Sequence, residues 1–245
     1  NPERLVVKNG VLDLTTGELD EHTPNEFHQS RLDVQFDETA ECPNIDAFLH
    51  EIVDPGDVDT LYRFIAHALY RGYPDAKALM CLGSGSNGKS VFLDLVGQFL
   101  GEFNTANKSL QELSHNRFAA QKLLGKLANI HADLGDQSVE TMSMFKQLTG
   151  DDTVDADVKF EDSVEFENHA TLMFSANQMP VLQDDTKGNW RRWALVRFPN
   201  SFDADDPDAK DPLPKRELRE QLFNDDEFED LLARCVEEIQ RWSET

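Results

Sequence analysis

A glycine-rich segment constrains the fold of this chain more than any other feature. Residues 83–90 read G-S-G-S-N-G-K-S and fit the pattern G-x-x-x-x-G-K-[ST]. An apolar run at 79–82 precedes the segment, and a helical pattern follows from Lys89. In this context glycines let backbone N–H groups point at phosphate oxygens, and the helix N-terminus adds positive charge. The sequence therefore predicts a nucleoside triphosphate site. Its residues are Gly83, Ser84, Gly85, Ser86, Asn87, Gly88, Lys89 and Ser90.

Two side chains of this loop have predicted chemical roles. The ammonium of Lys89 can reach the β- and γ-phosphates of ATP. The hydroxyl of Ser90 can coordinate the Mg²⁺ ion that accompanies the nucleotide. ATP and Mg²⁺ are therefore the expected cofactors.

Two further strand patterns end in polar residues. Residues 126–133 form an apolar strand that ends in Asp133, whose carboxylate would hold the water shell of the Mg²⁺ ion. Residues 170–177 form a buried strand that ends in Asn177. A polar residue at this position can orient the water that attacks the γ-phosphate. Both residues are predicted to lie beside the phosphate loop.

The chain is strongly acidic, with 47 Asp and Glu against 23 Lys and Arg and a formal net charge of −24. Nucleic-acid-binding proteins usually carry basic surfaces. Acidic residues spread along the whole chain, however, also favour adaptation to high salt, where charge maintains solubility. We favour this second interpretation. At about 1 M salt the Debye length is only ~3 Å, so any DNA contact would depend on a few close hydrogen bonds.

Cellular location is indicated only indirectly. The cysteines are far apart and form no C-x-x-C pair, which disfavours disulfide and zinc sites and favours a reducing cytoplasm. No apolar run approaches the ~20 residues that span a membrane, and no signal-peptide pattern opens the chain. The absence of an initiator methionine before Asn1 indicates a fragment.

Four segments are predicted along the chain. Residues 1–40 form a β-rich lead-in that includes a hairpin on the turn Asn9-Gly10, and residues 41–75 form a small helical domain. Residues 76–202 form the ATPase core. Residues 203–245 form an acidic loop and C-terminal helices.

Helical spacing also predicts individual buried side chains. Two helices in the 41–75 segment carry His50 and His67 near their apolar faces; paired metal ligation is conceivable, but packed or surface histidines are far more common. A third helix is expected over 109–124, with Phe118 and Leu124 among its buried residues.

Two cationic features have open interpretations. Residues 153–166 predict a hairpin with Lys159 near its tip; such a lysine is usually solvated, unless the tip lines a central channel. Arg191 and Arg192 lie between two tryptophans before an apolar strand. They either stack at the surface or act as an arginine finger on the γ-phosphate of a neighbouring subunit.

The order of these motifs resembles that of superfamily 3 helicases, and most closely the helicase part of phage- and plasmid-type primase–helicases, which are also similar to the poxvirus primase–helicase. The resemblance covers residues 36 to 202 approximately. The matching motifs are G-S-G-S-N-G-K-S (83–90), K-L-A-N-I-H-A-D-L (126–134), K-Q-L-T-G-D-D (146–152), T-L-M-F-S-A-N-Q-M-P (171–180) and G-N-W-R-R-W (188–193).

The resemblance implies an α/β fold with an AAA+-like P-loop NTPase core and a parallel central sheet. It further implies a ring, usually a hexamer, that binds ATP between subunits and single-stranded DNA in a central channel. In that family pattern Asp133 is the metal-side acid and Asn177 senses the γ-phosphate. Arg191 or Arg192 is the finger that acts on the neighbouring subunit, and Lys159 grips DNA.

Two departures from the family pattern leave points open. The second motif has Leu134 after Asp133 where many members have a second acid, so the carboxylate that activates water is undetermined; Asp136 is one candidate. No primase-like stretch is present, so a primase would be an upstream domain or partner. The alternatives are a phosphate-loop ATPase for DNA packaging or protein remodelling, and a relic domain without enzyme activity that binds nucleotide or only scaffolds a replication complex.

Overall fold

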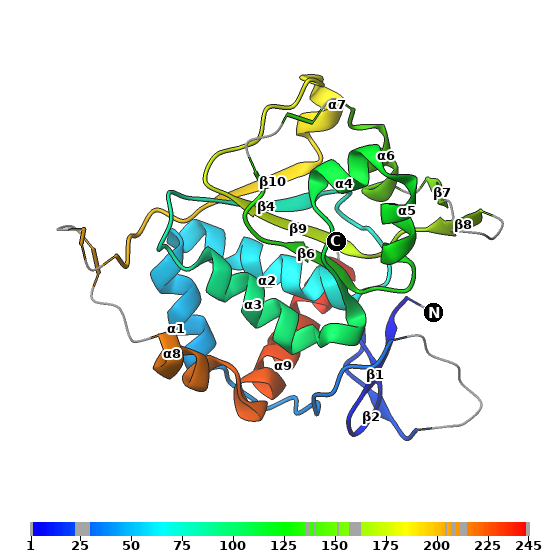
Figure 1. The fold of residues 1–245 in the computed structure, drawn as a ribbon. Helices are drawn as coiled ribbons and strands as arrows, with labels where there is room; N and C mark the ends of the chain where they lie inside the picture. Colours follow the sequence, from blue (N-terminus) through cyan, green and yellow to red (C-terminus); the bar gives the residue numbers. More distant parts are fainter. Residues whose placement is uncertain are drawn as a thin grey trace.

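The centre of the protein is a five-stranded parallel sheet (Figure 1). Its strands, in the spatial order β10-β4-β9-β6-β5, are β10 (Trp193–Arg197), β4 (Ala78–Leu82), β9 (Thr171–Ala176), β6 (Ala128–His131) and β5 (Thr105–Ala106). The computed structural model describes residues 2–22, 30–135, 138–139, 141–150, 152–156, 163–203, 205–206, 209–210 and 215–243. Because β9 lies between β4 and β6, the ends of these three strands are neighbours.

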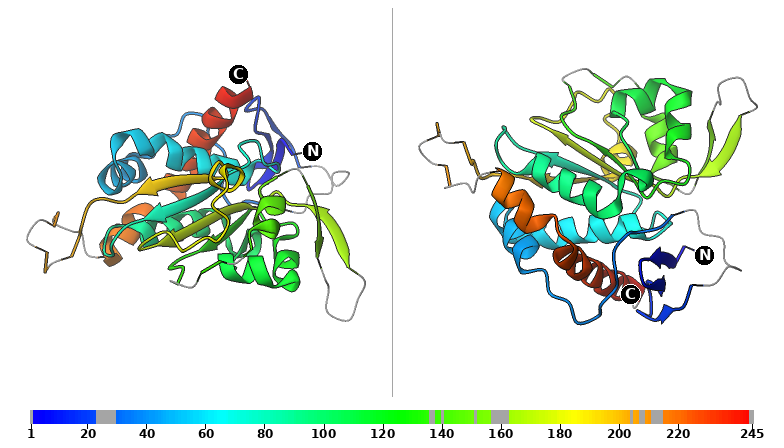
Figure 2. Two further views of the ribbon diagram at one scale, coloured as in Figure 1. Left: turned by 90° about the horizontal axis from the view of Figure 1, so that it is seen from above. Right: turned by 60° about the horizontal axis from the view of Figure 1, so that its bottom comes forward.

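Both faces of this sheet are covered, which explains its continuous apolar strands. All six residues of β9 are buried. One face packs against α2 (Pro55–Leu69) and α3 (Lys89–Leu100), and the other packs against α4 (Leu110–His115) and α6 (Ser143–Leu148) (Figures 1 and 2). Strand β4 serves both layers because its side chains alternate in direction: Leu79 contributes to the first and Met80 to the second.

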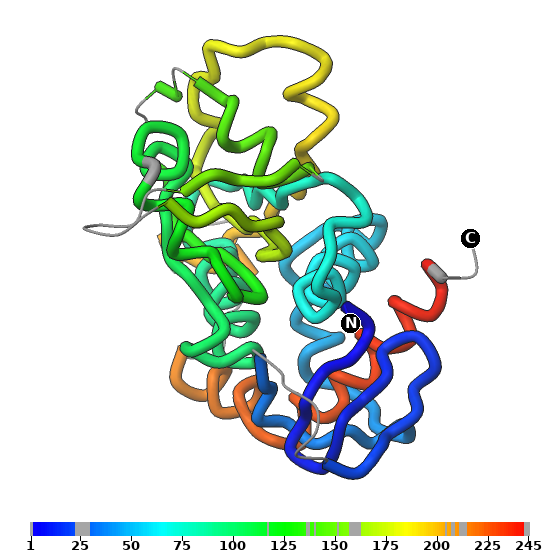
Figure 3. The backbone as a smooth tube through the Cα atoms, turned by 90° about the vertical axis from the view of Figure 1, so that its right-hand side faces the viewer, coloured from blue at the N-terminus to red at the C-terminus, as the bar shows by residue number. Residues whose placement is uncertain are grey.

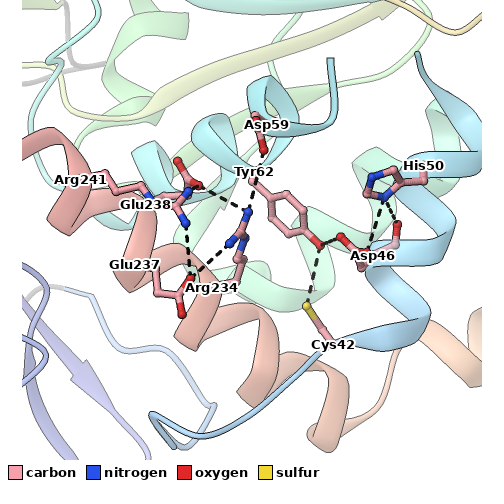
Figure 4. A network of polar contacts seen from close by, with 9 residues as sticks. All are labelled: Cys42, Asp46, His50, Asp59, Tyr62, Arg234, Glu237, Glu238 and Arg241. Atoms are coloured by element: carbon pink, nitrogen blue, oxygen red, sulfur yellow. Dashed lines mark hydrogen bonds and ion pairs between the residues drawn. The ribbon is translucent and has the colours of Figure 1, made fainter. Parts of the chain in front are cut away.

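The C-terminal helix α9 (Asp225–Ser243) packs along α2 and joins the same core as α1 (Pro43–Ile52) and α8 (Lys215–Leu222). Figure 4 shows the polar contacts at this junction. The guanidinium of Arg234 lies over the Tyr62 ring, 5.1 Å from its centroid. Glu238, which is only 9% exposed, forms ion pairs with two arginines of its own helix. Arg234, which also lies 3.8 Å from a carboxylate oxygen of Asp59, therefore fixes α9 to α2.

The N-terminal segment forms a small antiparallel sheet of β1 (Arg4–Val7), β2 (Gly10–Asp13) and β3 (Leu19–Asp20), which lies beside α9 (Figure 3). The predicted hairpin is present, but the predicted turn was one residue out of register. Val7 pairs with Gly10, so the turn consists of residues 8 and 9. Gly10 is instead needed for close packing, because a Cβ there would lie 2.4 Å from the Asp20 carbonyl oxygen.

The single helix expected over 109–124 was wrong. The segment is divided into α4, α5 (Arg117–Ala120) and a 3-10 turn (Gln121–Leu123). Asn116 causes the break, because its side chain accepts a hydrogen bond from the Phe118 N–H at 3.0 Å and caps a new helix. As a result Phe118 and Leu124 are 47% and 44% exposed and not buried.

The two histidines of the helical segment lie in different environments. His67 is buried, and its Nδ1 lies 2.8 Å from the Thr171 hydroxyl. His50 is exposed and hydrogen-bonds its own helix at the Asp46 carbonyl. The histidines therefore do not form a paired metal site. Within the described part of the chain, no helix has the length and apolar character needed to cross a bilayer.

Candidate nucleotide-binding site

The phosphate loop connects β4 to α3 at the carboxyl edge of the sheet, as predicted from the sequence. Gly88, at the N-cap of α3, has φ +89°, which favours glycine over other residues. A Cβ at Gly88 would also lie 2.5 Å from Cγ2 of Ile52, so the end of α1 packs directly against the loop. Ser84, Gly85 and Ser86 are exposed at the tip of the loop, where a nucleotide could approach.

Lys89 is held within the loop. Its ammonium donates to the Gly83 carbonyl at 2.6 Å and to Oδ1 of Asn87 at 2.9 Å. The residue is only 3% exposed, and this burial lowers the pKa of its ammonium, while the negative charge of Asp133 acts in the opposite direction. The lysine and the aspartate are therefore close enough to interact electrostatically.

The ends of β6 and β9 place the other two predicted residues at the same edge. The Asp133 N–H donates to the Ser175 hydroxyl at 3.1 Å, which ties the end of β6 to β9. Asn177 is exposed directly after β9, whose last carbonyl, Ala176 O, accepts a hydrogen bond from the Gly83 N–H at 3.3 Å. The structure thus brings the phosphate loop, Asp133 and Asn177 together; their individual roles stay predictions.

Backbone conformation also distinguishes this edge. Among the described residues, three non-glycine residues have positive φ, and two of them are Ser86 at +44° and Asp133 at +57°. Such conformations are uncommon and tend to occur at functional sites. Asp tolerates the left-handed region better than most residues, which suits it to this position.

The predicted Mg²⁺ ligands can be tested against this arrangement. Ser90 lies in the first turn of α3 and is exposed, and the Asp133 side chain is exposed at the neighbouring strand end. Among the residues described, no group of three or more His, Cys, Asp or Glu side chains could hold a metal ion. A hydroxyl and one carboxylate nevertheless fit Mg²⁺, which commonly takes only one or two protein oxygens and completes its shell with water and phosphates.

The arginine pair lies at the opposite edge of the sheet. Arg191 and Arg192 follow α7 (Lys187–Trp190) and precede β10, whose first residue pairs with the first residue of β4. The Arg192 carbonyl accepts a hydrogen bond from the Ala78 N–H at 2.8 Å. Within the described residues neither guanidinium forms an ion pair, although the chain has 47 acidic residues.

The two tryptophans beside this pair differ. Trp193 is buried and stacks on Phe145, with ring centroids 4.4 Å apart. Trp193 therefore does not stack with the arginines at the surface, and that prediction is wrong for this tryptophan. Trp190 is 39% exposed, and its indole N–H donates to Asp185 at 2.6 Å.

Two predicted residues lie outside the described residues. Strands β7 (Thr153–Ala156) and β8 (Val164–Glu167) form the expected antiparallel hairpin, but Lys159 between them is not described. Asp136 is likewise not described. The roles proposed for both residues therefore stay predictions.

Sequence reasoning missed two contacts that support the site. Asn87 hydrogen-bonds the carbonyl of Phe198, which is 111 positions away, so no local pattern could reveal the pair. Lys146, in the K-Q-L-T-G-D-D motif, forms a 2.5 Å ion pair with Asp184 and lowers the pKa of that carboxyl to about 2. This pair anchors the segment that leads to the arginine pair.

Fold and site together define an α/β protein with a phosphate-loop core, a parallel central sheet, preceding helices and a β-rich lead-in, which confirms the predicted fold class. One family model, described as a family of unknown function (DUF5906), matches residues 81–192, and another, "D5 N terminal like", matches residues 1–54. The chain is also similar to the C-terminal region of NrS-1, whose apo structure has a TM-score of 0.64 and 16% identity; the match covers 98% of this chain and 54% of that one.

Viral proteins provide the sequence relatives. The chain is 26% identical over 233 residues to "Putative primase C962R" of African swine fever virus (strain Badajoz 1971 Vero-adapted), covering 89% of this chain and 24% of that protein. It is 25% identical over 224 residues to "Putative helicase L207/L206" of Acanthamoeba polyphaga mimivirus, covering 85% and 23%. The chain thus resembles viral primase and helicase proteins and spans about a quarter of their length.

Proposed function

We propose that this chain is the motor part of an ATP-dependent DNA helicase or translocase that serves replication of a virus, plasmid or integrated element. The primase and helicase names of its relatives support a replication role. The phosphate loop with Asp133 and Asn177 beside it supports ATP hydrolysis with Mg²⁺. The order of motifs supports assignment to superfamily 3 and assembly as a ring, usually a hexamer.

The position of the arginine pair carries this proposal. Strands β4 and β10 are parallel, so the pair and the phosphate loop lie at opposite ends of β4, about 15–20 Å apart along the strand direction. An arginine side chain cannot span that distance to the nucleotide of its own subunit. Arg191 or Arg192 can therefore act on a γ-phosphate only in a neighbouring subunit.

The proposed chemistry is an in-line attack of water on the γ-phosphate. Lys89 and an arginine of the next subunit would stabilise the developing negative charge, and the bound Mg²⁺ would neutralise charge on the phosphates. Single-stranded DNA would pass through the ring centre and contact the β7–β8 hairpin, with Lys159 as the proposed gripping residue. A primase domain or partner upstream would complete the longer protein.

The decisive test measures ATP hydrolysis with and without single-stranded DNA in molar KCl, a salt concentration chosen because of the net charge of −24. Variant Lys89→Ala and the double variant Arg191→Ala/Arg192→Ala should each be inactive. A mixture of the two should regain activity, because some sites then combine an intact Lys89 with an intact arginine pair from the neighbour. Failure of the mixture to recover, with assembly preserved, would refute an arginine that acts on the neighbouring subunit.

The response of ATP hydrolysis to single-stranded DNA distinguishes the proposed motor from the alternative functions. Stimulation by single-stranded DNA, reduced in Lys159→Ala, supports a translocase. An active assembly that ignores DNA would instead favour protein remodelling. An assembly that binds ATP but releases no phosphate would indicate a relic domain.

A further inference from the structure

The side chain of Asn87 connects three parts of the nucleotide site. It is buried, with 3% of the residue exposed. Its Oδ1 accepts a hydrogen bond from the Lys89 ammonium at 2.9 Å, and its Nδ2 donates to the Phe198 carbonyl at 3.3 Å. We propose that Asn87 is a positioning residue, which holds the Lys89 ammonium at the phosphate loop with its charge intact and ties the loop to the end of β10. This inference rests on the proposed nucleotide site.

The chemistry of the amide explains why asparagine suits this position. An amide offers both an acceptor and a donor, and this site uses one of each. A carboxylate of the same size would accept from Lys89 but could not donate to Phe198 O. It would also neutralise the ammonium that is meant for the phosphates. An aliphatic side chain could make neither contact.

The surroundings leave room for this amide and for little else. A Cβ on Gly83 would lie 2.0 Å from Nδ2 of Asn87 and 2.8 Å from the Phe198 carbonyl oxygen, so the absence of a side chain at Gly83 makes the contact possible. Phe198 is itself fixed, because its N–H donates to Leu82 O at 2.8 Å. The carbonyl that anchors Asn87 therefore lies directly after β10, in a residue that is hydrogen-bonded to the end of β4.

A second tie reaches the loop from the same side. The Phe202 N–H donates to the Ser86 carbonyl at 2.7 Å. The segment after β10 thus holds the loop at Asn87 and at Ser86. A lysine fixed in this way needs less ordering when phosphate binds, which favours affinity.

Two variants distinguish positioning from simple space filling. Asn87→Asp keeps the size of the side chain but places a negative charge beside the Lys89 ammonium. Asn87→Ala removes both hydrogen bonds of the amide but does not neutralise the charge of Lys89. Affinity for a fluorescent ATP analogue is measured by titration, and the midpoint of thermal unfolding is measured on the same samples. Lys89→Ala shows whether the measured binding occurs at this loop.

We expect Asn87→Asp to weaken ATP binding by about tenfold or more, and Asn87→Ala to weaken it less. Thermal stability should fall in both variants, because each loses the hydrogen bond to the Phe198 carbonyl, so the order of ATP affinities is the measurement that distinguishes the two roles. A space-filling role predicts that alanine is the worse variant in both measurements, so equal or tighter ATP binding by Asn87→Asp than by Asn87→Ala would overturn the proposal.

The binding titration, combined with the assay of hydrolysis with and without single-stranded DNA, separates this inference from the proposed function. A wild-type chain that binds no nucleotide would overturn both. A wild-type chain that binds ATP, with the expected order of variants but no response to DNA, would overturn the motor and support the role of Asn87.

Discussion

Replacing Gly83 by alanine tests how closely the phosphate loop fits the end of the sheet. The added Cβ would lie 2.0 Å from Nδ2 of Asn87 and 2.8 Å from the Phe198 carbonyl oxygen. Both distances are well below van der Waals contact. Asn87 is buried and short, and the Phe198 oxygen is a backbone atom, so neither can move aside without breaking their mutual hydrogen bond.

The expected loss of stability follows from two contributions. Overpacking of a close-packed site costs about 1–3 kcal/mol, and loss of the hydrogen bond between Asn87 and Phe198 adds about 1 kcal/mol. The free energy of unfolding of Gly83→Ala should therefore fall by about 2–4 kcal/mol. In a chain of 245 residues, this corresponds to a lowering of the thermal midpoint by about 4–16 °C.

Gly97→Ala is the matched control. Gly97 lies inside α3, and its new Cβ would meet only Cδ1 of Ile130, at an ordinary 3.9 Å. Alanine in a helix interior should stabilise by about 0.5–1 kcal/mol, so the same substitution should have the opposite sign. Both variants are followed by calorimetry in molar KCl. A Gly83→Ala midpoint within about 2 °C of wild type would refute the close fit.

Three further outcomes follow from buried groups. Burial lowers the pKa of His67 to about 4. The folded protein should therefore lose up to about 3 kcal/mol of stability as pH falls from about 6.5 to 4. In urea unfolding, the stability of His67→Gln should depend less on pH over this range. Glu238→Ala removes a carboxylate that is 9% exposed from ion pairs with Arg234 and Arg241, whose side chains are 31% and 56% exposed, and should lower the free energy of unfolding by about 1–2 kcal/mol, whereas Glu237→Ala, 57% exposed, should change it by less than about 1 kcal/mol. The three cysteine thiols are buried, and burial raises the pKa of Cys42 to about 11, so a thiol reagent at neutral pH should react only after unfolding.

The site residues close to one another in sequence were the most predictable. The pattern at 83–90 and the apolar runs before it specify a strand, a loop and a helix through local backbone chemistry, and these elements are present. The ends of β6 and β9 could also be located, because continuous apolar runs mark strands covered on both faces. Each prediction required only short stretches of the chain.

The features that sequence reasoning missed depend on distant residues or on competition between local preferences. The order of the strands, with β9 between β4 and β6, is set by pairing between segments far apart in the chain. Asparagine is tolerated inside helices, but here the side chain of Asn116 caps a new helix, and Phe118 is exposed as a result. The tie between Asn87 and Phe198 follows only once β10 lies beside β4.

The two edges of the sheet have consequences for assembly. In the proposed assembly, the arginine edge of one subunit contacts the phosphate-loop edge of the next. Such an interface uses two different surfaces and is therefore heterologous, so every subunit has both neighbours only when the assembly closes into a ring. Two subunits joined in this way without closure complete one nucleotide site and leave the other without an arginine. Activity per subunit should therefore rise as open oligomers lengthen and reach its maximum at closure. A hydrolysis rate per subunit that does not change across dilution, while light scattering shows dissociation, would mean that each subunit is catalytically complete.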